Sequence, residues 1–263
     1  MFTKISKFKR RLRSLCLYVF KRIENNGNAK FETNGEEKFL FQWFDKIKAN
    51  KDKEYTFFDV GANIGKYCEM LLNLSQKNQL KLKIFAFEPT KSCLKELYKK
   101  FDTSTIVNII PFGASNETGA FNIYYNAEKS GFASLYQRDL DRINIQMNQS
   151  ETIKTLRLDA VIKEKNIEHI HFLKIDIEGH EIKALEGLGE YLNTQFIDVI
   201  QFEYGGANLD SRTYLKDFYD LFTKKGFKIA KILPTGLELR EYQTYMENFD
   251  YANYVAFSPQ VIE

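Results

Sequence analysis

The densest group of reactive side chains lies in residues 172–187, which read FLKIDIEGHEIKALEG. Here an apolar run becomes acidic and then takes on helical spacing. The reactive side chains in it are Lys174, Asp176, Glu178, His180 and Glu181. Carboxylates and an imidazole at this density could bind a metal, transfer protons or clamp a cofactor. They could equally form a solvent-exposed turn without a function. The rest of the chain is needed to decide between a functional site and such a turn.

A second group of residues surrounds a glycine turn. Asp59 lies near the end of an apolar run, and the turn GANIG (residues 61–65) follows it. Glycines after a strand let the backbone turn tightly and let a ligand approach the main chain. This turn therefore indicates a nucleotide-type site.

The details of the turn argue against a pyrophosphate ligand. In a dinucleotide fingerprint, glycine or alanine would occupy the positions of Asn63 and Lys66. Asp59 would also repel phosphate, whereas it suits a ligand with a cationic amino-acid end. S-adenosyl-L-methionine has such an end and no phosphate. Glu88, at the end of the next strand, can accept both ribose hydroxyls, so we predict this cofactor.

Strands and helices alternate along most of the chain. Apolar strands are expected over residues 55–60, 83–89, 105–112, 169–177 and 196–204. Amphipathic helices are expected over residues 66–74, 91–101, 181–188 and 213–226. This alternation is typical of a mainly parallel sheet covered on both faces. We predict a doubly wound α/β fold.

Two segments depart from this alternation. Residues 113–168 form a long insert that is expected to supply extra β-structure and a lid. Its aromatic side chains could line a sugar site or form a satellite core: Tyr124, Tyr125, Phe132 and Tyr136. Residues 227–233 and 251–259 read as a closing antiparallel pair at the edge of the sheet.

The composition indicates one substantial core. The chain has 263 residues, of which 44% are hydrophobic, and 38 basic and 35 acidic side chains give a formal charge of +3. A near-neutral chain of this kind is not built as a nucleic-acid binder. We predict a globular domain over residues 51–263, preceded in residues 1–50 by a basic helix, a linker and another helix.

The basic segment, residues 1–22, contains no acidic residue. Its apolar residues recur at helical spacing on one face: Ile5, Phe8, Leu12, Leu15 and Val19. This stripe could dock on the domain, or the helix could lie on an anionic membrane or meet a charged partner. The apolar run is far shorter than the ~20 residues that cross a bilayer, and it fits a signal peptide poorly.

The cysteines form no disulfide or metal-binding pattern. Cys16, Cys68 and Cys93 are widely spaced and odd in number. Such usage is typical of a reducing compartment. We predict a cytoplasmic protein, with peripheral contact to the inner face of the membrane as a second interpretation of the basic helix.

The chain resembles the FkbM-type methyltransferases, a branch of the class I S-adenosylmethionine-dependent enzymes. The matching stretches lie between residues 55 and 205 and occur in the family's order: FFDVGANIGKY, FAFEPTKSCLKEL, IIPFGASNETGAFNIYYN, GFASL, TLRLDAVI, FLKIDIEGHEIKALEG and IQFEYG. The resemblance implies a seven-stranded Rossmann-like sheet. It also implies methylation of a hydroxyl oxygen on a sugar, glycan or natural product.

The resemblance also implies roles for individual residues. Glu88 would hold the ribose, and the turn containing Ala114 and Ser115 would flank the adenine. Asp176 would face the methyl group and the acceptor. The methionine end of the cofactor would be held by Asp59, Gly61, Ala62, Asn63 and Gly65. This chain departs from the family in having His180 where a small residue is common.

The candidate catalytic residues are Lys174, Asp176, Glu178, His180 and Glu203. Methyl transfer is an in-line displacement, so a base is needed only to make the acceptor oxygen nucleophilic. Lys174 could neutralise Asp176 or lean toward the acceptor. His180 could be a general base or peripheral, and Glu178 and Glu181 could stabilise a helix start. We predict no metal, although Asp176, Glu178 and Glu203 could together bind Mg²⁺.

Three other functions are weaker interpretations of the sequence. A non-catalytic module could keep the fold and dock through the basic helix. A nicotinamide oxidoreductase is disfavoured by Asn63 and Lys66. Methylation of nucleic acid is disfavoured by the near-neutral charge and by the absence of an N/D-P-P-Y motif.

Overall fold

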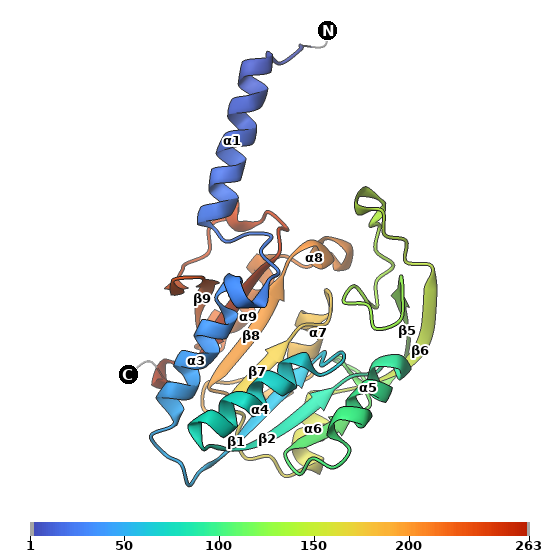
Figure 1. The fold of residues 1–263 in the computed structure, drawn as a ribbon, viewed down its shortest axis with the longest axis vertical. Helices are drawn as coiled ribbons and strands as arrows, with labels where there is room; N and C mark the ends of the chain where they lie inside the picture. The colour runs from blue at the N-terminus through green and yellow to red at the C-terminus, as the bar shows by residue number, and fades with distance from the viewer. Residues whose placement is uncertain (1–2, 262–263) are drawn as a thin grey trace.

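The computed structural model describes residues 3–261. Residues 1–2 of the predicted N-terminal segment and residues 262–263 of the predicted domain lie outside the described part. An eight-stranded sheet forms the body, with strand order β10-β9-β11-β8-β7-β1-β2-β3 (Figure 1). Its strands are β1 (Glu54–Val60), β2 (Lys81–Phe87), β3 (Val107–Ile110), β7 (Phe172–Ile175), β8 (Val199–Tyr204), β9 (Lys228–Leu233), β10 (Gly236–Leu239) and β11 (Ala252–Phe257). The α-helices are α1 (Lys7–Ile23), α2 (Phe31–Asn34), α3 (Glu36–Ile47), α4 (Lys66–Asn78), α5 (Lys91–Phe101), α6 (Leu158–Glu164), α7 (Glu181–Glu186), α8 (Gly206–Ser211) and α9 (Leu215–Lys224).

The central strands β3, β2, β1, β7 and β8 run parallel. Successive side chains of a strand point to opposite faces, and here both faces are covered. Phe57 of β1 joins a core with α3, α4 and α5, whereas Phe58 joins the core formed with α6, α7 and α9. The doubly wound α/β prediction is confirmed.

The far edge of the sheet is antiparallel, as expected. β11 lies between β8 and β9 and is antiparallel to both. β10 then pairs with β9 and forms the outermost strand. This hairpin strand raises the sheet to eight strands, one more than the resemblance implied.

The insert contains the expected β-structure but also a helix. β4 (Gly113–Ala114), β5 (Gly119–Tyr125) and β6 (Gln149–Leu156) form a separate three-stranded sheet in the order β4-β6-β5. Figure 1 shows β5 and β6 beside the main sheet. Residues 158–164, within the insert that was expected to supply extra β-structure and a lid, form α6, because Leu158, Val161 and Ile162 share a helical face that packs into the core.

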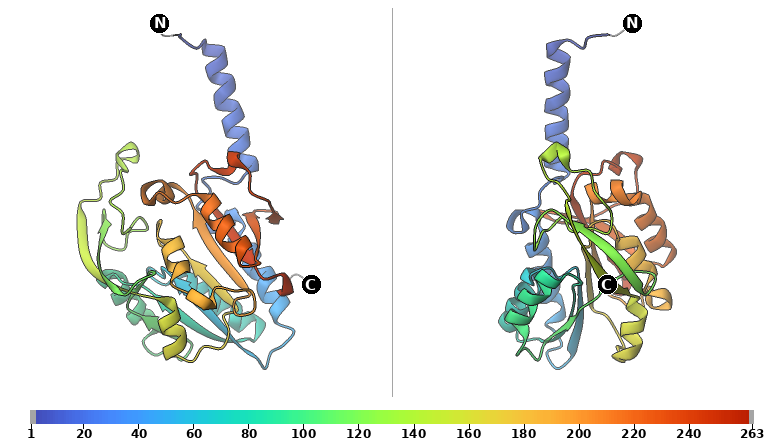
Figure 2. Two further views of the ribbon diagram at one scale, coloured as in Figure 1. Left: turned by 180° about the vertical axis from the view of Figure 1, so that it is seen from behind. Right: turned by 90° about the vertical axis from the view of Figure 1, so that its right-hand side faces the viewer.

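The basic helix α1 projects from the body (Figure 2). None of its residues is buried. The interpretation in which its apolar stripe docks on the domain is therefore wrong, because only the base of the helix meets the body. Among residues 3–261, no helix has the length and apolar character needed to span a bilayer.

Candidate functional site

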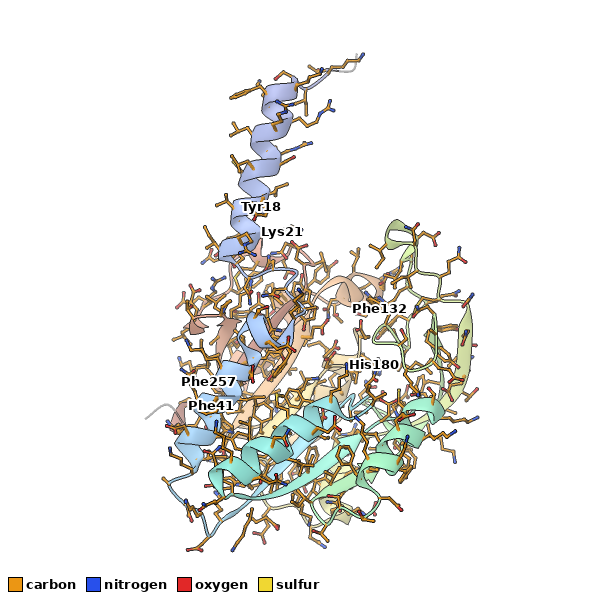
Figure 3. All side chains as sticks on the ribbon, viewed as in Figure 1. Tyr18, Lys21, Phe41, Phe132, His180 and Phe257 are labelled. Carbon is orange, nitrogen blue, oxygen red and sulfur yellow. The ribbon has the colours of Figure 1, made fainter. Side chains whose placement is uncertain are left out.

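A cleft lies where the parallel strands end, which is where ligands bind in open α/β sheets. The insert forms its opposite wall, and Figure 3 shows Phe132 and His180 near the space between them. The residues used below that line this cleft are Gly61, Asn63, Glu88, Ala114, Tyr125, Asp176, Glu178, His180, Glu203 and Tyr251.

Gly61 makes the sharp turn after β1. Its φ is +90°, and its amide donates to the carbonyl of Phe87 at 3.0 Å. A Cβ on this residue would lie 1.9 Å from the backbone oxygen of Asp176. Glycine is therefore required both by the backbone conformation and by the close approach of the turn after β7.

We expect Gly61→Ala to lower the free energy of unfolding by at least about 2 kcal/mol, because the methyl group meets backbone that cannot move aside. Urea unfolding measures this change. Gly131→Ala is the control, since nothing lies within 4 Å of its Cβ; its effect should stay within about 0.5 kcal/mol. Equal effects at the two positions would contradict the steric explanation.

Glu88 is held at the mouth of β2 by three hydrogen bonds. Oε2 accepts from the amide of Asn63 at 3.0 Å, and Oε1 accepts from the amide and hydroxyl of Thr90 at 2.8 and 2.5 Å. Burial raises the pKa of Glu88, although these donors oppose the rise. A carboxylate has about four acceptor positions, so Glu88 keeps one for a ligand in the cleft.

Other predicted cofactor residues stand behind the wall of the cleft. Asp59 is fully buried and accepts from Cys68 Sγ at 3.1 Å. Gly65 directly precedes α4 with φ +80°, and a Cβ there would lie 2.5 Å from Phe101. Ala62 and Ser115 are also buried and do not line the cleft. If these residues contribute to cofactor binding, they do so by positioning the residues that line the cleft.

Three carboxylates meet at the mouth of the cleft. Asp176, Glu178 and Glu203 each offer an oxygen, and these atoms lie within 4.8 Å of one another. Lys174 points the same way as Asp176 and donates to its Oδ2 at 2.8 Å. The expected convergence of these side chains is therefore present.

The pKa values of Asp176 and Glu203 are shifted in opposite directions. Burial acts to raise the pKa of Asp176, but the Lys174 ammonium outweighs it and the pKa is lowered. Burial raises the pKa of Glu203 well above its usual value, and the charge of Asp176 adds to the rise. The lowered pKa favours the ionised form of Asp176, and the raised pKa favours the protonated form of Glu203.

Glu178 and Glu181 were both expected to stabilise a helix start, but they have different surroundings. The strand ends before Glu178, whose φ of +53° turns its carboxylate into the cleft toward Arg138. Glu181 is buried, and its Oε1 accepts from the amides of Ile177 and Gly179 at 3.1 and 3.0 Å. Glu181 therefore stabilises the turn, whereas Glu178 faces the cleft.

Arg138 was not predicted from the sequence. Its buried guanidinium comes from the insert and pairs with Glu178 and with Asp210, the latter at 3.1 Å. It ties the insert to the turn after β7 and to α8. No local spacing signals this role, because the three residues lie far apart in the chain.

His180 has both ring nitrogens occupied. Nε2 lies 3.0 Å from the Ser115 hydroxyl and Nδ1 lies 3.0 Å from the Tyr136 hydroxyl. Burial lowers its pKa to about 4, and the charge of Lys183 acts in the same direction. These contacts make His180 a link between the insert and the main sheet.

We expect His180→Gln to keep most of the activity and to change the acid stability. Unfolded histidine gains a proton below about pH 6.5, whereas folded His180 does so only near pH 4. Wild-type stability is therefore lost as the pH falls through this window. Urea unfolding at pH 7 and pH 5 should show a loss about 2 kcal/mol larger in the wild type than in the variant. Parallel losses would show that His180 does not titrate in this range.

A further polar group lies at the other ends of the strands. His169 Nε2 is 2.9 Å from Asp198, and His171 lies beside them. His171 Nδ1 accepts from the amide of Thr56 at 3.0 Å, so its proton sits on Nε2. That nitrogen has no lone pair for a metal, so this group is not suited to bind one.

The family model for the methyltransferase FkbM domain matches residues 59–229, more than half of the chain. The chain belongs to the FkbM methyltransferase family. The methyl donor of this family is S-adenosyl-L-methionine, in agreement with the prediction from the turn after β1.

Two relatives of this FkbM-family chain are similar in sequence. The hexuronic acid methyltransferase AglP of Haloferax volcanii is 24% identical over 156 residues, which are 59% of this chain and 58% of AglP. The methyltransferase sdnD of Sordaria araneosa is 26% identical over 169 residues, covering 54% of this chain and 63% of sdnD. The chain thus covers less than two thirds of the length of either relative.

A solved FkbM methyltransferase is also similar. It comes from Methylobacillus flagellatus KT and is 17% identical, with a TM-score of 0.47 over 77% of this chain and 43% of that one.

Proposed function

We propose that the protein transfers the methyl group of S-adenosyl-L-methionine to a hydroxyl oxygen of a sugar, glycan or similar acceptor. The observation that carries this proposal is the convergence of Asp176, Glu178 and Glu203 beside the glycine turn. A group of carboxyl groups that can donate and accept hydrogen bonds suits a ligand rich in hydroxyls.

The cofactor is proposed to lie along the ends of β1, β2 and β4. Gly61 and Asn63 would hold the methionine end by their main-chain carbonyls, because their amides already donate to Phe87 and Glu88. Asp59 lies buried behind them. The free acceptor position of Glu88 would take a ribose hydroxyl, and Ala114 would flank the adenine. This placement brings the sulfonium toward Asp176.

The reaction needs only one proton acceptor. The acceptor hydroxyl would donate its proton to the ionised carboxylate of Asp176 as its oxygen bonds to the methyl carbon. The carbon–sulfur bond breaks with its electron pair on sulfur, which leaves S-adenosylhomocysteine. Lys174 would keep Asp176 ionised and oriented, and Tyr125 offers an aromatic surface for a sugar ring.

A sugar acceptor is supported by the name of one relative, which acts on hexuronic acid. Calorimetry with S-adenosylhomocysteine tests the cofactor, and methyl transfer from labelled cofactor to neutral and uronic-acid oligosaccharides tests the acceptor. A base-stable methyl ether is expected. Base-labile product would reveal transfer to a carboxylate, and failure of the folded protein to bind S-adenosylhomocysteine would favour a non-catalytic module.

Methyl transfer is expected to be unchanged by a chelator. Lys174 and Arg138 already neutralise Asp176 and Glu178, so the carboxylates do not need a cation to coexist. Initial rates with EDTA and with added Mg²⁺ measure this. A rate that falls with EDTA and returns with Mg²⁺ would assign the three carboxylates to a metal.

A further inference from the structure

Helix α1 carries an apolar face that is exposed along the length of the helix. Residues spaced three and four apart share one side of a helix. On α1 this side consists of Phe8, Leu12, Leu15, Val19 and Ile23. Phe8 is 74% exposed and Leu15 is 58% exposed. Burying apolar surface gains about 25 cal/mol for each Å² removed from water. The stripe is therefore suited to bind an apolar surface of a partner.

The charges on α1 indicate the chemistry of this partner. Its first turn has no acidic residue, and none occurs anywhere between Lys7 and Ile23. At about 100° per residue, Lys9 and Arg13 lie on one flank of the stripe and Arg11 and Arg22 on the other. Long basic side chains can keep their apolar stems on a nonpolar surface while their charged ends reach outward.

We propose that α1 docks on the surface of a membrane that contains anionic lipids. The apolar stripe enters the boundary between headgroups and acyl chains, and the basic flanks contact the headgroups. A second copy of α1 is a poorer partner, because two helices without acids would repel each other. A membrane surface supplies both an apolar phase and negative charge.

The base of α1 is fixed to the body, so docking also orients the domain. The buried carboxylate of Glu24 pairs with Lys231 at 3.2 Å and with Arg240. Just beyond, the amide of Gly27 donates to the carbonyl of Tyr251 at 2.8 Å. Tyr251 lines the cleft. Docking through α1 therefore holds the rim of the cleft near the membrane.

Co-sedimentation of the full chain with vesicles tests this proposal. Vesicles of phosphatidylcholine alone are compared with vesicles that also contain phosphatidylglycerol. We expect binding to the anionic vesicles that weakens as salt increases. Arg11→Gln and Arg13→Gln should each lower the affinity about fivefold. No methyl transfer is measured, so the result is independent of the proposed reaction.

A matched pair of variants tests the face of the helix. Leu15→Gln should weaken vesicle binding about tenfold, whereas Leu17→Gln should leave it within about twofold. Leu17 is 53% exposed but lies on the opposite side of α1. Circular dichroism checks that both variants stay helical.

Several outcomes would overturn the proposal. These are no binding of the wild type to anionic vesicles, equal binding to both vesicle types, or equal losses in the two leucine variants. A dimer that Leu15→Gln abolishes, without any vesicle binding, would assign the stripe to a contact between two copies.

Discussion

Replacing Asp176 with Asn is expected to lower kcat by about a hundredfold or more, within the range that a positioned proton acceptor contributes. Asn fills the same space and can still accept from Lys174 Nζ, which now lies 2.8 Å from Asp176. It cannot take a proton from the acceptor hydroxyl. Steady-state kinetics with labelled S-adenosyl-L-methionine measure the change, and binding of S-adenosylhomocysteine should fall much less.

Asp159→Asn is the matched control for this variant. Asp159 accepts from Arg157 at 2.7 Å, so it also belongs to a short ion pair, but it does not line the cleft. Its activity should stay within about twofold of the wild type. If Asp176→Asn retained a similar activity while folded, the proton would have to go elsewhere, and Glu178 would be the next candidate in the cleft.

Replacing Glu88 with Gln is expected to weaken S-adenosylhomocysteine binding by about tenfold to a hundredfold. Both oxygens of Glu88 accept from N–H donors, on Asn63 and Thr90. Gln has only one oxygen, so its amide nitrogen must face one of these donors. The loss of a buried acceptor should also cost about 1–3 kcal/mol of stability. Calorimetry and urea unfolding measure the two effects separately.

Glu69→Gln provides the control on the neighbouring helix α4. Glu69 pairs with Lys100 at 2.9 Å, and its side chain is 46% exposed. Neither its cofactor affinity nor its stability should change appreciably, because exposed pairs contribute little. Unchanged affinity in Glu88→Gln would remove Glu88 from the cofactor site.

The order of the elements and the position of the cleft follow from the sequence. Apolar runs that end in Asp59, Glu88 and Asp176 are local signals, and the carboxyl ends of parallel strands must meet at one edge of a sheet. The turn GANIG also specifies its own geometry, because few residues other than glycine adopt positive φ easily. The element order, the position of the cleft and the geometry of this turn can therefore be predicted without information on contacts between residues far apart in the chain.

The tertiary structure decided which side chains reach the cleft. Asp59 and Glu181 lie near the chemistry in sequence, yet both are buried. Glu178 faces Arg138 because a positive φ redirects it after the strand ends. Such orientations depend on turns and on partners far away in the chain, which a local pattern does not contain.

The same distinction applies to helix α1. Its spacing and charge specify an amphipathic basic helix, since both are properties of residues close in sequence. Whether the apolar stripe packs on the body depends on how the C-terminal end of the helix is attached to the body. Glu24, paired with Lys231 and Arg240, fixes the base so that α1 points away from the body. The sequence by itself determined the helix, the sheet and the edge that holds the cleft, whereas long-range ion pairs and turn geometry decided which surfaces remain free to bind.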